Sequence, residues 1–220
     1  EVQRRIKKYY GRESVVVYPP VNLATSHQPS ATRLKNTEGL LLEASGYYLI
    51  VSRLVPYKRI DIAIRAFNKL KLPLKIAGIG SEDRKLRSIA CPNIEFLGYL
   101  TERELVRYYM ECCALVFPTY EDFGLTVLEA QSFGKPVIAF RGGGALETVI
   151  EGKTGEFFYP QTEDALIKKI KEFKRSKYNP LECIKNAEKF SYGRFKREFM
   201  DIINTSSKLK AKNSKLQRKV

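Results

Sequence analysis

The hydrophobic residues of this 220-residue chain change their spacing along its length, and the change divides the sequence. From residue 46 onward, short apolar runs alternate with segments whose apolar residues repeat at helical spacing. Strands that are apolar throughout and alternate with helices are typical of a parallel sheet covered on both faces. The pattern predicts a doubly wound, Rossmann-like α/β domain of about six strands. We expect the strands at Tyr47–Val51, Leu74–Ala77, Ile94–Leu97, Leu115–Phe117, Val137–Phe140 and Gly155–Phe158.

Helical periodicity fills the segments between these runs. In a doubly wound sheet, ligands bind outside the carboxyl ends of the strands, so we expect the chemistry in the loops that lead into these helices. The helices are expected at about 60–70, 81–89, 102–111, 125–133, 145–151 and 162–175, followed by two more at about 181–190 and 192–203.

The residues before the domain have a different pattern. Residues 1–12 read as a basic amphipathic helix ending at Gly11, and Ser14–Tyr18 as a short strand stopped by Pro19 and Pro20. Residues 22–45 are polar and poorly periodic, as in a connector. We therefore expect residues 1–45 to be a linker and 46–203 to be the folded domain.

The last residues, 204–220, are rich in Lys, Ser and Asn, and we expect a disordered tail there. The tail holds part of the chain's net charge of +15, which arises from 39 Lys and Arg against 24 Asp and Glu. Such an excess suits solubility, nucleic acid, an anionic membrane surface or a phosphorylated ligand. No RRM, KH or zinc-finger pattern accompanies it, so we expect no nucleic-acid partner and allow peripheral contact with an anionic membrane.

Composition narrows the class of protein further. An apolar content of 44% predicts a packed core, and no run of about 18 apolar residues is present to span a membrane. The charged start of the chain is unlike a signal peptide. Four cysteines without C-x-x-C spacing fit free thiols in a reducing cytoplasm, and the lone His27 lies in a polar stretch where a solvated loop residue is expected.

Two carboxylates, Glu121 and Glu129, lie eight residues apart around Gly124. With Glu121 in a loop and Glu129 about a turn into a helix that begins near Leu125, both can face one pocket. The amides of Phe123, Gly124 and Leu125 would lie at the helix N-terminus, where an anion binds favourably. Acceptors for hydroxyls beside donors for phosphate suit a nucleotide sugar.

A second motif, Ser52–Arg59, follows the first strand of the sheet. Arg53 offers a planar fork of donors and Lys58 offers a point charge, a pair that suits a diphosphate. Basic loops are common, so this motif indicates a diphosphate site only in combination with the other motifs of the chain.

Glycine-rich and capped turns follow three other strands. Gly78 and Gly80 could let backbone amides approach a ligand, or could form a simple tight turn, and they lack the third glycine of a dinucleotide fingerprint. Backbone near Leu100, just before a plausible N-cap at Thr101, could meet the edge of a base. The glycines at 142–144 permit close packing on the loop that holds Glu121, and both a ligand role and a simple flexible turn remain open for them.

Other chemistries have no candidate residues. The sequence contains no P-loop lysine motif, no Asp-x-Asp pair for a divalent metal and no Ser-His-Asp set. We therefore expect no metal or other cofactor, with Arg53 and Lys58 neutralising a leaving diphosphate instead.

In this order and at these strand ends, the motifs resemble the C-terminal, nucleotide-sugar-binding half of retaining GT-B glycosyltransferases of family 4, over about residues 14–200. The likeness rests on Val17–Asn22, Ser52-Arg53 with Lys58, Phe96–Gly98, Glu121–Leu125 with Glu129-Ala130, Gly134–Val137, Gly143-Gly144 with Glu147, and Gly152 with Gly155.

By this resemblance, Arg53 and Lys58 hold the donor diphosphate, Glu129 accepts from the ribose hydroxyls, and Glu121 with the following amides contacts the transferred sugar and phosphate. The Tyr-Pro-Pro-Val and Glu-Asp-Phe-Gly segments look most like GDP-mannose-dependent mannosyltransferases that act on glycan or lipid-linked acceptors. Such enzymes also have an N-terminal acceptor domain, so we expect this chain to be the donor-binding half and to be inactive without that domain. A non-catalytic nucleotide-sugar-binding partner and a basic RNA- or membrane-associated protein remain alternatives.

Overall fold

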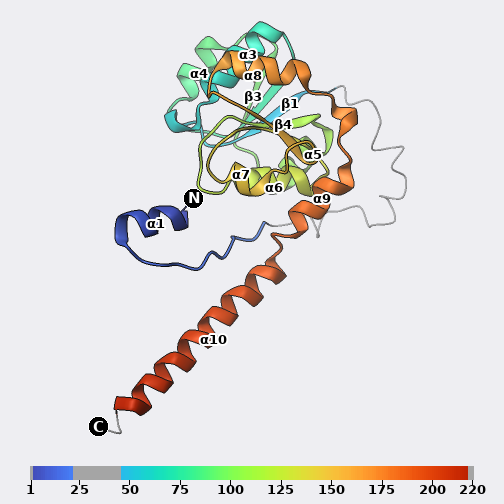
Figure 1. Cartoon of the computed structure of the whole chain (residues 1–220). Coiled ribbons are helices and arrows are strands. Elements are labelled where there is room, and N and C mark those ends of the chain that lie inside the picture. The colour runs from blue at the N-terminus through green and yellow to red at the C-terminus, as the bar shows by residue number, and fades with distance from the viewer. Residues whose placement is uncertain (1, 22–45, 218–220) are drawn as a thin grey trace.

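The computed structural model describes residues 2–21 and 46–217, with side chains placed through residue 205. Its centre is one parallel sheet with the strand order β3-β2-β1-β4-β5-β6 (Figure 1). This order confirms the doubly wound, Rossmann-like architecture, and each strand lies within about one residue of its predicted position. The strands are β1 Tyr48–Val51, β2 Leu74–Ala77, β3 Ile94–Gly98, β4 Ala114–Phe117, β5 Val137–Phe140 and β6 Gly155–Phe158.

Helices cover both faces of the sheet. In Figure 1, α3, α4 and α8 lie over one face, while α5, α6 and α7 lie over the other. Each layer of helices encloses its own hydrophobic cluster against the sheet. The helices are α3 Ile60–Leu70, α4 Asp83–Ile89, α5 Glu102–Glu111, α6 Leu125–Ser132, α7 Ala145–Thr148, α8 Glu163–Glu172 and α9 Pro180–Glu188, with 3-10 turns η2 Pro56–Lys58 and η3 Arg175–Lys177.

Residues on one strand alternate between the two clusters. In β1, Ile50 belongs to the cluster under α3, α4 and α8, whereas Leu49 belongs to the cluster under α5 to α7. Both are essentially inaccessible to solvent. Because successive strand side chains point to opposite faces, a central strand between two helical layers, such as β1, is apolar on both of its faces.

The segments before and after the domain differ in part from the expectations. Helix α1, Val2–Tyr10, ends at Gly11 with φ +61°, as predicted. The predicted strand at Ser14–Tyr18 is wrong, because residues 11–21 have no regular secondary structure. β-branched residues favour extended backbone, but a strand also needs a partner, and the sheet provides none to this segment.

At the other end, helix α10 runs through Tyr192–Gln217, which includes most of the segment predicted to be a disordered tail. From residue 194 to 217 the sequence has no Gly or Pro, and its Lys, Leu, Ala and Gln residues favour helix. Figure 1 shows α10 extending away from the sheet. Among the described helices, none is both long and apolar enough to cross a membrane.

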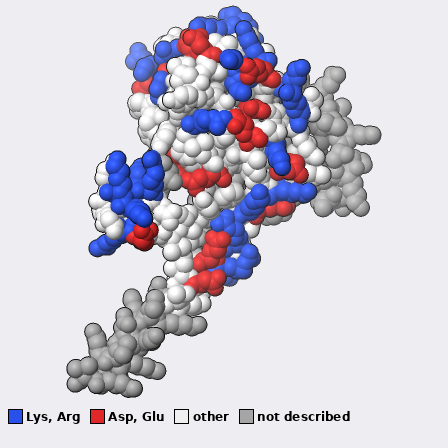
Figure 2. All heavy atoms as spheres, in the orientation of Figure 1, with Lys and Arg blue, Asp and Glu red and all other residues white. Residues whose placement is uncertain are grey.

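Charge is unevenly placed on the surface. Helix α1 has four basic residues and no acidic one, and these gather as a blue patch in Figure 2. The predicted connector at 22–45, with His27, lies outside the described residues.

Candidate functional site

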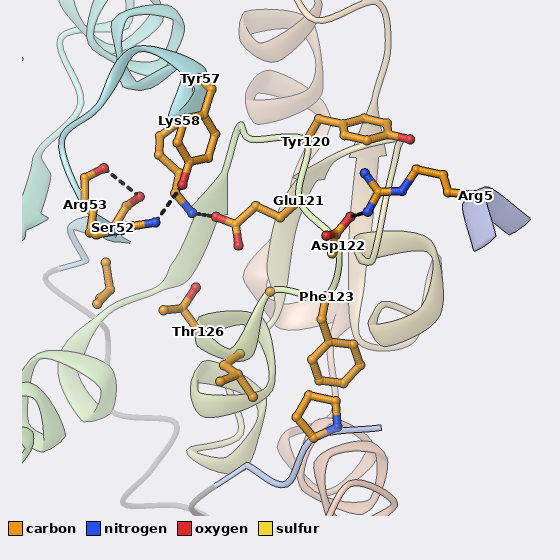
Figure 3. A pocket seen from close by; sticks show the side chains of 14 residues that line it. Arg5, Ser52, Arg53, Tyr57, Lys58, Tyr120, Glu121, Asp122, Phe123 and Thr126 are labelled. Atoms are coloured by element: carbon orange, nitrogen blue, oxygen red, sulfur yellow. Dashed lines mark hydrogen bonds and ion pairs between the residues drawn. The ribbon is translucent and has the colours of Figure 1, made fainter. Parts of the chain in front are cut away.

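A cleft of about 570 Å³ lies at the carboxyl ends of β1 and β4. These two strands are neighbours in the sheet although β2 and β3 lie between them in the sequence, so the strand order reverses here. In open α/β sheets this switch point is where ligands bind. The cleft is lined by Arg5, Pro19, Val51, Ser52, Arg53, Tyr57, Lys58, Tyr120, Glu121, Asp122, Phe123, Gly124, Leu125 and Thr126 (Figure 3).

The basic side of the cleft is the loop between β1 and α3. The guanidinium of Arg53 donates to the Tyr57 hydroxyl at 2.8 Å, which orients its fork of donors. Leu54 is fully buried beneath the loop, and its backbone N–H donates to the carbonyl of Ile79 at 2.9 Å. The loop is therefore anchored from below while its cationic side chains line the cleft.

Lys58 is one of two buried lysines in the described part of the chain, the other being Lys135, and only 8% of it is exposed. Its ammonium forms an ion pair with the Glu121 carboxylate across the cleft (Figure 3). Burial and then the nearby Arg53 guanidinium lower the pKa of Lys58 to about 8. The ion pair joins the two motifs that the sequence analysis selected independently.

The acidic side of the cleft is the loop between β4 and α6. Gly124 precedes α6 with φ +85° and lies against the ring of Phe117, where a Cβ would approach one ring carbon to 2.7 Å. A glycine is needed here for both reasons. Since Gly124 has no side chain to cap α6, the first amides of the helix are left to the cleft, which Gly124, Leu125 and Thr126 line.

The glycines after β5 support the same loop. The N–H of Gly144 donates to the carbonyl of Glu121 at 2.7 Å. A Cβ on Gly143 would come within 2.1 Å of that same oxygen, and one on Gly144 within 2.2 Å of the Phe123 Cα. The prediction that these glycines permit close packing on the Glu121 loop is confirmed.

Four predicted donor-binding residues, Gly78, Gly80, Leu100 and Glu129, do not line the cleft. Gly78 and Gly80 pack against the β1 loop, where a Cβ would fall 1.8 Å from the carbonyl oxygen of Ser52 and 2.2 Å from that of Leu54. Their observed role is to let two strand-end loops lie together. Leu100 is half-buried in the turn before α5, and its neighbour Thr101 is the predicted N-cap, within a capping box.

Glu129 lies on α6 behind the residues that line the cleft. One of its carboxylate oxygens accepts a hydrogen bond from the hydroxyl of buried Tyr109 at 2.7 Å. Burial raises the pKa of Glu129, and the Tyr109 hydrogen bond opposes this rise. The contact between Glu129 and a ribose remains a prediction. It would have to form beside the hydrogen bond that Glu129 already accepts from Tyr109.

The structure adds cleft residues that the sequence analysis missed. Tyr120 and Asp122 flank Glu121 in the sequence, so the motif itself contained the signal for them. Arg5, on α1, forms an ion pair with Asp122 across 117 residues of sequence, and nothing in the local pattern indicated it (Figure 3).

The segments at both ends of the chain meet the acidic loop at Phe123. The ring of Phe123 stacks on Tyr18 at 5.5 Å and meets the edge of Phe190 at 5.6 Å. Arg194, at the start of α10, lies over the Tyr18 ring. The linker before the domain and the helices after it therefore fix one wall of the cleft.

The lining suits an anionic ligand that also has hydroxyl groups. Arg53 and Lys58 with the α6 N-terminus offer donors to phosphate oxygens, and Glu121 offers an acceptor. In the part of the chain that the structure describes, no three His, Cys, Asp or Glu side chains group as metal ligands.

Comparison with known proteins places this geometry in a family. The model for "Glycosyl transferases group 1" matches residues 35–190. The alpha-1,3/1,6-mannosyltransferase ALG2 of Dictyostelium discoideum is 44% identical over 70 residues, which are 31% of this chain and 17% of that protein. The chain thus spans well under two thirds of this relative's length.

Solved structures share the fold. A glycosyltransferase from Rickettsia africae matches with a TM-score of 0.74 at 20% identity, over 91% of this chain and 60% of the other. Anabaena HepE, solved in complex with UDP and glucose, matches with a TM-score of 0.65 at 21% identity, over 80% of this chain and 52% of the other. These likenesses show that the chain shares its α/β fold with part of each of the two structures.

Proposed function

This chain belongs to the glycosyl transferases group 1 family, and we propose that it forms the donor-binding part of a retaining, family 4 mannosyltransferase that uses GDP-mannose. The observation that carries the proposal is the convergence of Arg53, Lys58, Glu121 and the α6 N-terminus on one cleft at the switch point of the sheet. The mannosyltransferase name of the D. discoideum relative supports the choice of sugar.

In the proposed reaction the mannosyl group leaves GDP through an oxocarbenium-like transition state. Negative charge then develops on the departing diphosphate, and the buried ammonium of Lys58 with the fork of Arg53 would stabilise it. Both groups are held before any ligand arrives, Arg53 by Tyr57 and Lys58 by burial. We propose that this pre-organised charge serves without a metal ion.

Glu121 has a double position in this proposal. Its carboxylate pairs with Lys58 in the described structure, and we propose that the same carboxylate accepts from hydroxyls of the transferred sugar. Binding of the diphosphate would draw Lys58 away and leave Glu121 to the sugar. We assign no covalent nucleophile.

The acceptor and the attachment to other molecules are also proposals. A glycan or lipid-linked acceptor would receive the sugar, with an N-terminal domain providing most of its contacts. The basic segment 204–220 would add loose attachment to anionic lipid, worth about 1 kcal/mol per basic residue near the surface. Deleting it should reduce binding to anionic vesicles without changing the melting temperature.

Calorimetric titration of GDP, UDP, ADP and their sugar conjugates, in the presence of a metal chelator, tests the proposal. We expect GDP and GDP-mannose to bind more tightly than the other nucleotides. Equal or tighter binding of UDP compounds, which the HepE complex makes the natural comparison, would refute the choice of guanine. Binding that appears only after Mg²⁺ is added would refute the metal-free mechanism.

A further inference from the structure

Three aromatic rings continue from the cleft along the edge of the sheet. Tyr120 follows β4, Phe140 ends β5 and Tyr159 follows β6. The Phe140 ring stacks on Tyr159 with centroids 6.3 Å apart, and the Tyr120 and Phe140 centroids are 6.4 Å apart. Phe140 is only 9% exposed, whereas Tyr120 is 45% and Tyr159 is 71% exposed. Two exposed tyrosines therefore rest on one buried phenylalanine.

The row is held in place by its surroundings. The side chain of Gln161 donates to the carbonyl of Pro118 at 2.8 Å and thereby ties the segment after β6 to the end of β4. A Cβ on Gly142 would come within 2.8 Å of the Phe140 ring and 2.9 Å of the Tyr120 ring, so the glycine lets the rings approach each other. The exposed rings are thus presented by two anchored segments.

The row of aromatic rings starts at the donor cleft and leads away from it along the sheet. The strand order places the diphosphate cations after β1, Glu121 after β4, and the tyrosines from β4 to β6. In Figure 3, Tyr120 lies on the opposite side of Glu121 from Lys58. A molecule that receives a sugar beside Glu121 would extend over Tyr120 toward Tyr159.

We propose that Tyr120 and Tyr159, supported by Phe140, form a subsite that stacks against pyranose rings of the acceptor glycan. The inference rests on the proposed function, which places the transferred sugar at Glu121. A pyranose has a C–H face and a rim of hydroxyls, and a tyrosine matches it with an apolar ring and a polar tip. Asp122 and Arg5, at the adjoining rim of the cleft, add groups that bind hydroxyls.

The test is a calorimetric or NMR titration of α-1,6-mannotriose into the full chain, with and without saturating GDP. We expect Tyr159→Ala to weaken binding by about fivefold or more, and Tyr159→Phe, which keeps the ring, to weaken it by less than twofold. Tyr99→Ala is the matched control, because Tyr99 is 72% exposed and lies after β3, at the far end of the same edge.

Absence of mannotriose binding would overturn the subsite. So would binding that Tyr159→Ala leaves unchanged, or that Tyr99→Ala weakens equally. Because Tyr159 is largely exposed, its truncation should leave the melting temperature within about 1 °C, which separates lost binding from lost folding. The GDP titration reports separately on the proposed function, since a chain that binds GDP without mannotriose refutes only the subsite.

Discussion

The two loops that form the cleft achieve rigidity in opposite ways. The β1 loop is anchored by apolar burial, with Leu54 fully enclosed and the cations above it. The β4 loop is anchored by close backbone contact, with Gly143 and Gly144 against Glu121 and Phe123. One loop is basic and the other acidic, and Lys58 and Glu121 join them. The comparison shows that two loops anchored by different means are joined across the cleft by one ion pair of their own side chains.

Removal of Lys58 should have the largest effect, because the basic loop would lose its buried charge. Hydrogen bonds to charged groups contribute about 1.5–3 kcal/mol, so Lys58→Ala should weaken GDP binding by about 10- to 150-fold in calorimetry. Lys85→Ala is the control, since Lys85 is exposed on α4 and pairs with Glu82. A loss below threefold would contradict the assignment of Lys58 to the diphosphate.

Raising the pH should produce a similar loss in the unaltered chain. The pKa of Lys58 is lowered to about 8, so GDP affinity should fall by about twofold from pH 7 to 8 and then more steeply, approaching tenfold per pH unit above pH 8. The free energy of unfolding should instead increase with pH. As the pH rises from the lowered pKa of Lys58 toward the usual pKa of a lysine, the folded chain no longer has to bury a charged ammonium.

Lys58→Arg keeps its charge over this whole range, so its affinity for GDP should not fall between pH 8 and 9. An identical pH dependence in this variant and in the unaltered chain would show that another group titrates.

Replacement of Glu129, a carboxylate farther along α6, should change GDP affinity by about tenfold. If Glu129 accepts from the ribose diol, Glu129→Gln should lower GDP affinity by about that factor while the fold survives. Tyr109→Phe is the matched comparison, because it removes the protein hydrogen bond to Glu129 and leaves the carboxylate in place. Equal losses in the two variants would mean that Glu129 acts through the packing of α6 alone.

The smallest expected change is an increase in GDP affinity, and it follows from the contrast between the basic loop and the acidic loop. Glu121→Gln removes the anion that competes with the diphosphate for Lys58. We expect GDP to bind about fivefold more tightly, and GDP-mannose to gain less because the sugar loses an acceptor. Asp122→Asn changes the neighbouring carboxylate and should leave GDP affinity within twofold. Weaker GDP binding by Glu121→Gln would show that Glu121 supports the diphosphate site.

The sequence predicted the sheet and both loops because their signals are local. A short apolar run such as β1 favours a strand that is buried on both faces. Arg53, Lys58 and Glu121 each follow such a strand. Parallel strands bring their carboxyl ends to one edge, so Arg53, Lys58 and Glu121 could be expected at the same edge of the sheet without any knowledge of tertiary contacts.

The parts of the structure that were not predicted depend on tertiary contacts, which local sequence patterns do not contain, or on helix propensity that was underestimated. Arg5 reaches Asp122 over 117 residues. The expected strand at 14–18 has no partner, and the expected tail remains helical because nothing in residues 194–217 breaks a helix. Glu129 has the predicted spacing, but its bond to Tyr109 depends on how α5 packs against α6.

The central claim is that the cleft between the two loops binds the diphosphate of a nucleotide sugar. A crystal structure of this chain with GDP tests it most directly. We expect the phosphates within hydrogen-bonding distance of Arg53 and Lys58 and facing the first amides of α6, with the ion pair between Lys58 and Glu121 broken. A diphosphate bound elsewhere, or one that leaves Lys58 paired with Glu121, would contradict the claim.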